Sequence, residues 1–84
     1  MPVYIDILVT ADDGPSRTLS VPVGRCLDAI IEPVDSAKPD MKGIIIHFLG
    51  GESIITNDYT VKSFVQFMGD VVTTIARRNS LVQR

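Results

Sequence analysis

The sequence predicts a small α+β domain built from two β-hairpins and two helices. Along residues 61–75, apolar residues recur at steps of three and four, the spacing of one face of an α-helix. Apolar and polar residues alternate in residues 3–10 and again in residues 17–23, the period of a β-strand with one buried side. An apolar run at residues 44–49, followed by two glycines, adds a second hairpin.

The first hairpin is predicted over residues 3–23. The odd-numbered positions of residues 3–9 are all apolar, so they share the buried side of the first strand. Residues 11–16 read Ala-Asp-Asp-Gly-Pro-Ser and are dense in turn formers. Pro22 has no backbone N–H, so we expect the second strand to lie at a sheet edge or to end there.

A short helix is predicted next, over about Arg25 to Glu32. Its apolar side would hold Leu27, Ile30 and Ile31. Pro33 would end this helix, because proline disfavours helical geometry in the residue before it.

The second hairpin begins with residues 44–49, which are apolar on both faces except for His47. We expect this strand to be covered on both sides or to face a partner chain. Residues 50–52, Gly-Gly-Glu, form a tight turn, and residues 53–56 form the returning strand. Asn57 or Asp58 would then cap the long helix by accepting hydrogen bonds from its free N–H groups.

The element order is therefore ββαββα in a single domain of residues 1–84. The simplest packing is a two-layer sandwich, in which a four-stranded, mostly antiparallel sheet carries both helices on one face. The other face of the sheet is left open, and its side chains are the candidate interface residues. They are Tyr4, Leu8, Ile45, His47 and Leu49.

The composition favours self-association. The 84 residues are 45% apolar and 21% charged, which is more apolar surface than a monomer of this size readily buries. We expect a homo-oligomer, most simply a two-fold dimer formed sheet to sheet through the open face. The predicted function is that of a non-catalytic binding or accessory protein. Besides a second copy of the chain, a different protein is the other expected kind of partner.

The charge is acidic overall and uneven along the chain. A net charge of −2 and a pI near 5.1 argue against general nucleic-acid binding. Residues 1–60 hold nine acids and four bases, whereas residues 61–84 hold four bases and one acid. Arg77 and Arg78 are expected in the last turn of the long helix, where cations favour the negative end of its dipole.

The sequence predicts a soluble cytoplasmic protein without membrane contact. No apolar run approaches the ~20 residues needed to span a bilayer. The first residues, Met-Pro-Val-Tyr-Ile-Asp, lack the charged start of a signal peptide. The single cysteine, Cys26, excludes an internal disulfide and a cysteine-based metal cluster. No cofactor or metal is expected.

Two side chains are candidates for chemistry, and neither is assigned a catalytic role. His47, the only histidine, would need a nucleophile or carboxylate within reach, and Asp6 is the candidate on the same type of face. A histidine at the sheet surface or a dimer interface is the favoured interpretation. Cys26 follows Arg25, which could favour the thiolate. The ordinary role of a free cysteine is nevertheless that of a small buried hydrophobe.

The opening Met1-Pro2-Val3-Tyr4-Ile5 resembles that of the tautomerase superfamily. The resemblance implies a small enzyme in which Pro2, freed of Met1, is the general base. Members of that superfamily continue from the first strand into a long helix, whereas here a turn and a second strand come next. A tautomerase-like enzyme that uses Pro2 is therefore a remote alternative to the binding function.

The layout also resembles the ubiquitin-like β-grasp family. Gly-Gly at residues 50–51 is followed at residues 58–64 by Asp-Tyr-Thr-Val-Lys-Ser-Phe, similar to the family's pattern of acid, threonine, aliphatic residue and aromatic. The resemblance implies a last strand over residues 70–77 and an adaptor that offers a sheet face to protein partners. Pro33 shortens the first helix, and residues 81–84, Leu-Val-Gln-Arg, lack the paired glycines of conjugated members.

Overall fold

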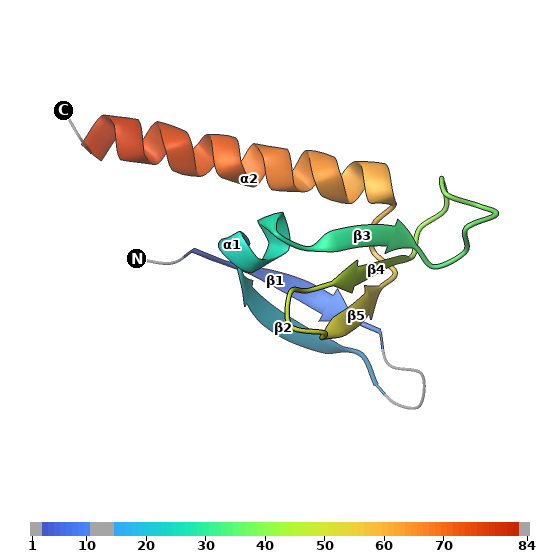
Figure 1. Ribbon diagram of the computed structural model, residues 1–84. Helices are drawn as coiled ribbons and strands as arrows, with labels where there is room; N and C mark the ends of the chain where they lie inside the picture. Colours follow the sequence, from blue (N-terminus) through green and yellow to red (C-terminus); the bar gives the residue numbers. More distant parts are fainter. Residues whose placement is uncertain (1–2, 11–14, 83–84) are drawn as a thin grey trace.

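The computed structural model describes residues 3–10 and 15–82 (Figure 1). Within these residues the element order is ββαβββα, which confirms the α+β class. The elements are β1 (Tyr4–Val9), β2 (Arg17–Pro22), α1 (Val23–Leu27), β3 (Ile30–Pro33), β4 (Ile44–His47), β5 (Ser53–Thr56) and α2 (Val61–Val82).

The strands are arranged as two antiparallel sheets. β1 pairs with β2 in a two-stranded sheet, and β4 lies in the middle of the three-stranded sheet β3-β4-β5. A backbone hydrogen bond of 2.8 Å from the Thr10 N–H to the Ile55 carbonyl connects the end of β1 to β5. The predicted single four-stranded sheet is therefore not seen.

The helix predicted over Arg25 to Glu32 is wrong in its second half. The helix α1 is only Val23–Leu27, and the strand β3 follows it. The register places Ile31 opposite Ile46, so a β-branched residue of β3 packs beside one of the central strand. β3 is an edge strand, where Pro33 is tolerated because no ladder hydrogen bond is needed on its outer side.

The helix α2 continues without a break through residues 70–77. The strand that the β-grasp resemblance implies there is therefore wrong. The 22 residues of α2 correspond to a length of about 33 Å. Because α2 extends to Val82, Arg77 and Arg78 lie before its last turn, not within it as expected.

Thr60 caps α2, in place of the predicted Asn57 or Asp58. Thr60 Oγ1 accepts a hydrogen bond of 3.0 Å from the Ser63 N–H, and Ser63 Oγ accepts one of 2.8 Å from the Thr60 N–H. This reciprocal arrangement is a capping box in which serine replaces the usual Glu or Gln.

We expect Thr60→Ala to lower the free energy of unfolding by about 1 kcal/mol, because the Ser63 N–H loses its acceptor. Urea denaturation followed by circular dichroism measures this change. Thr60→Ser keeps the hydroxyl and is the matched control. Equal losses in the two variants would contradict the capping role.

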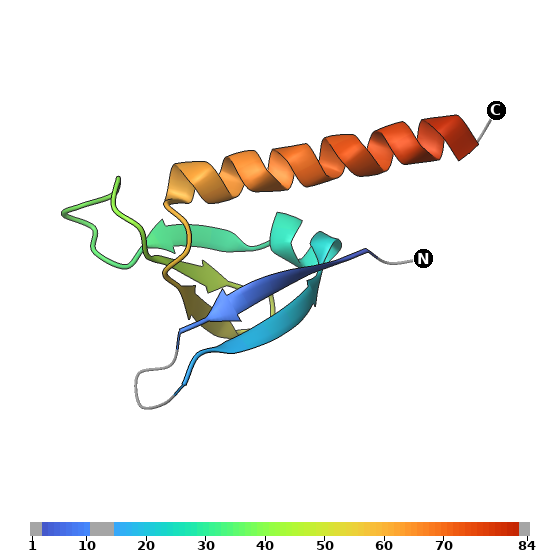
Figure 2. The ribbon, with the colours of Figure 1, turned by 180° about the vertical axis from the view of Figure 1, so that it is seen from behind.

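The core lies between the strands and the first half of α2, while the second half of α2 extends over α1 and the start of β1 (Figure 2). Among residues 61–78 of α2, Phe64 and Met68 are buried. Phe64 is fully buried, as are Ile7, Ile44, Ile46 and Thr56. Because residues alternate along a strand, the neighbours of these residues in β1 and β4 point outward.

Candidate functional site

The outward side of the three-stranded sheet forms one surface, which we call the outer sheet face. It consists of two cross-strand rows, because side chains of paired residues lie side by side. One row is Ile30, His47 and Ser53, and the other is Glu32, Ile45 and Ile55.

The five predicted interface residues are all at least partly exposed, but they belong to different parts of the fold. Ile45 and His47 lie on the outer sheet face. Leu49 lies in the turn that follows β4 and is 73% exposed. Tyr4 and Leu8 point outward from β1, in the two-stranded sheet.

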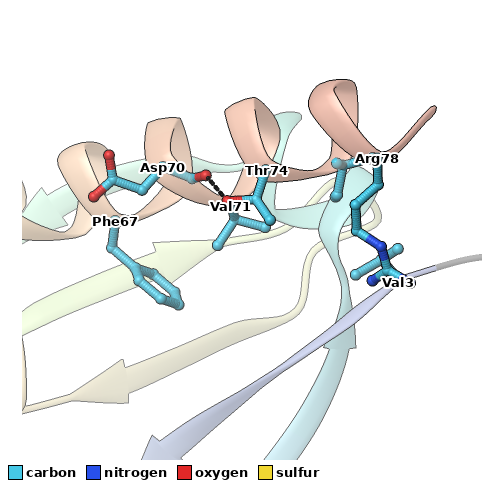
Figure 3. Close-up of a pocket in the computed structure, with 7 residues that line it drawn as sticks. Val3, Phe67, Asp70, Val71, Thr74 and Arg78 are labelled. Carbon is cyan, nitrogen blue, oxygen red and sulfur yellow. Dashed lines mark hydrogen bonds between the residues drawn. The ribbon is translucent and has the colours of Figure 1, made fainter. Parts of the chain in front are cut away.

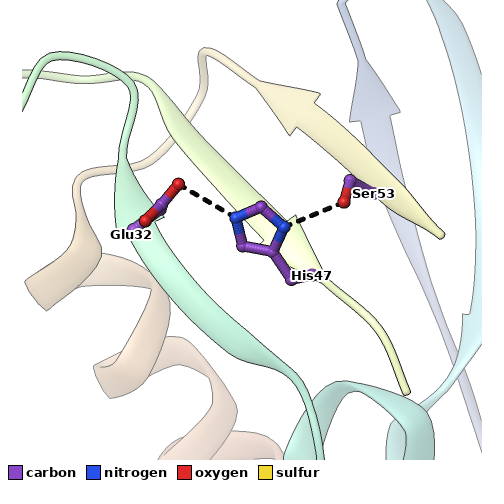
Figure 4. Close-up of polar contacts among 3 residues, drawn as sticks. All are labelled: Glu32, His47 and Ser53. Carbon is purple, nitrogen blue, oxygen red and sulfur yellow. Dashed lines mark hydrogen bonds and ion pairs between the residues drawn. The ribbon is translucent and has the colours of Figure 1, made fainter. Parts of the chain in front are cut away.

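His47 is held by hydrogen bonds on both ring nitrogens (Figure 4). Nδ1 lies 2.9 Å from Ser53 Oγ, and Nε2 lies 2.9 Å from Glu32 Oε1. The carboxylate beside His47 is therefore that of Glu32. Asp6, the candidate from the sequence, instead accepts a hydrogen bond of 2.6 Å from Ser20 Oγ. Sequence reasoning missed Glu32 because it assigned this residue to a helix.

The line from Glu32 through His47 to Ser53 has the connectivity of an acid-histidine-hydroxyl relay. Such a relay needs a cavity for the substrate and donors that stabilise a developing oxyanion. Glu32 and Ser53 are exposed on an open sheet, and neither lines the two hollows that lie along α2. The arrangement therefore connects the three neighbouring strands β3, β4 and β5.

Acidic side chains accompany the apolar ones on the outward surface. Asp6 lies between Tyr4 and Leu8 on β1, and Glu32 lies beside Ile45. The base Arg25 of α1 is engaged by Glu52 at 3.5 Å and stacks over the Phe48 ring, 4.7 Å from its centroid. Glu32 therefore lies on the outer sheet face, whereas Asp6 lies on the two-stranded sheet.

Cys26 is buried, as the sequence predicts for a free cysteine. Burial raises the pKa of its thiol, and the charge of Arg25 opposes this shift only in part. Burial therefore disfavours the thiolate, which is the nucleophilic form of cysteine. Pro2 lies outside the described residues.

No group of three His, Cys, Asp or Glu side chains in residues 3–10 and 15–82 is placed to hold a metal ion. Over the same ranges, no helix has the length and apolar character needed to cross a bilayer. No protein-family model, curated protein or solved structure matches this chain.

Proposed function

We propose that this protein is a small non-catalytic binding protein whose outer sheet face contacts another protein. The observation that carries the proposal is the clustering of exposed apolar side chains there. Ile30 is 72% exposed and neighbours His47 across the strands, while Ile45 and Ile55 form an adjacent apolar pair. Single exposed apolar residues are ordinary, but neighbouring ones with a polar fringe are typical of a protein interface.

The acidic charge of residues 1–60 favours a partner with a basic surface. Residues 1–60 carry nine acids and four bases, and Glu32 lies on the outer sheet face beside Ile45. The complementary surface is apolar at its centre and basic at its rim. A second copy docked through the same face would bring a Glu32 carboxylate from each copy into one interface. We therefore assign the face to a different protein, and the sheet-to-sheet dimer stays a prediction from the sequence.

The test begins with a photo-cross-linking residue at position 30, and the captured protein is identified by mass spectrometry and purified. Calorimetry then compares its binding to the wild type, to Ile30→Ser and to Met41→Ser. Met41 is a matched control because it is also apolar, is 57% exposed and lies in the segment between β3 and β4, outside the two rows of the outer sheet face. We expect Ile30→Ser to weaken binding about tenfold and Met41→Ser to leave it unchanged.

The salt dependence adds a second readout. If the partner's rim is basic, Glu32→Gln weakens binding at low ionic strength and has less effect at high ionic strength. Equal affinities for Ile30→Ser and Met41→Ser would contradict the proposal. Recovery of the chain itself as the only cross-linked protein would replace it with the sheet-to-sheet dimer.

A further inference from the structure

An apolar groove runs along the middle of α2, from Phe67 to Arg78, and shares no lining residue with the outer sheet face (Figure 3). Its volume is about 240 Å³, and we call it the α2 groove. The lining residues are Val3, Phe67, Asp70, Val71, Thr74, Ile75 and Arg78. Phe67, Val71 and Ile75 remain only partly buried, because no element of the described chain covers the groove.

The groove carries one acid and one base, separated along the helix. Asp70 and Arg78 are eight residues apart, which corresponds to about 12 Å along α2 and is too far for a direct ion pair. The ion pairs found in residues 3–10 and 15–82 involve neither of them. Thr74 lies midway between the two, and its hydroxyl already donates to the Asp70 carbonyl at 2.9 Å.

We propose that the α2 groove binds the α2 helix of a second copy, antiparallel and with the two-fold axis at Thr74. In this arrangement Asp70 of each chain lies beside Arg78 of the other, so two identical ion pairs form at once. A parallel arrangement would place like charges together. The charge pattern is therefore complementary to itself, which favours a second copy over an unrelated helix.

The apolar residues and the charges have different roles in this interface. Covering Phe67, Val71 and Ile75 supplies the driving force, since these side chains are incompletely buried in one chain. Surface ion pairs add little affinity, but they determine register and orientation. The inference does not depend on the proposed function. A dimer of this kind would leave both outer sheet faces free, so one dimer could bind two partner surfaces.

Charge reversal tests the proposal directly. Sedimentation velocity over a wide range of concentrations should show a monomer–dimer equilibrium for the wild type. Asp70→Arg or Arg78→Asp alone should weaken the dimer about tenfold or more, because each creates two like-charge contacts. Mixing the two single variants should restore association as a heterodimer, since every contact then joins opposite charges. Arg77→Asp makes the same change of charge outside the groove and should leave association unchanged.

Several results would overturn the proposal. They are a wild type that stays monomeric at all concentrations, a dimer insensitive to either reversal, and a mixture of the two variants that fails to associate. A dimer that survives both reversals but is lost in Ile30→Ser would instead use the outer sheet face. If a reversal unfolds the chain, Asp70→Asn and Arg78→Gln provide the neutral versions of the same test, and each should weaken the dimer.

Discussion

Replacing Phe64 with alanine is expected to lower the free energy of unfolding by about 3–5 kcal/mol. Phe64 is 0% exposed and is the residue through which α2 enters the core. Its ring meets that of Tyr59 edge to face, with centroids 5.2 Å apart, and lies 6.3 Å from that of Phe67. Truncation removes these contacts and leaves a cavity between the helix and the sheets.

The loss is large for a domain of this size. Small domains have a total stability of roughly 5–15 kcal/mol, so Phe64→Ala would leave the chain marginally folded. Urea denaturation followed by far-ultraviolet circular dichroism measures the change. Val65→Ala is the matched control, because Val65 is the next residue of the helix and is 56% exposed. It should alter stability by no more than about 0.5 kcal/mol. Equal losses in the two variants would contradict the packing of α2.

The helix α2 could be predicted because its signal is local and long. A three-four repeat over fifteen residues places Phe64 and Met68 on the same side whatever the rest of the chain does. The β-branched residues near its middle favour a strand by propensity, but packing of the amphipathic face decides the outcome. Alternation in β1 was similarly informative, since it separated buried Ile7 from exposed Leu8.

The strand β3 could not be predicted from local pattern. It has four residues, too few to distinguish a period of two from a helical period. What makes it a strand is its pairing with β4, which lies more than ten residues further along the chain. Missing β3 also hid the contact between Glu32 and His47, which depends on that pairing.

The outer sheet face and the α2 groove also differ in how far the sequence could predict them. Ile45 and His47 were predicted as outward residues because alternation within one strand is sufficient to place them. The α2 groove brings Val3 beside residues of α2 that lie more than sixty positions away. The charge pattern of Asp70 and Arg78 is visible in the sequence, but it becomes informative only when both are known to line one groove.

Gly43→Ala is expected to destabilise the fold by about 1–3 kcal/mol, because alanine must adopt a backbone conformation that is nearly restricted to glycine. Gly43 has φ +123° and is buried just before β4. Its N–H donates to the Tyr59 carbonyl at 2.8 Å, and its carbonyl accepts from the Val34 N–H at 3.0 Å. These two bonds hold the backbone on both sides, so the strain cannot be relieved by a small rotation. An added Cβ would also lie 3.4 Å from Asn57 Oδ1.

Gly24→Ala is the matched control, because Gly24 lies in α1, lacks a positive φ, and a Cβ there would meet open space. It should be neutral or stabilising by up to about 1 kcal/mol. Urea denaturation should therefore show that the same substitution changes the free energy of unfolding in opposite directions at the two positions, or leaves it unchanged at Gly24. If Gly43→Ala left the free energy of unfolding unchanged, the chain between β3 and β4 could rearrange without a loss of stability. In that case the bond from Gly43 to Tyr59 would not hold the segment that leads into α2, and the position of α2 would depend on the packing of its own buried and partly buried side chains.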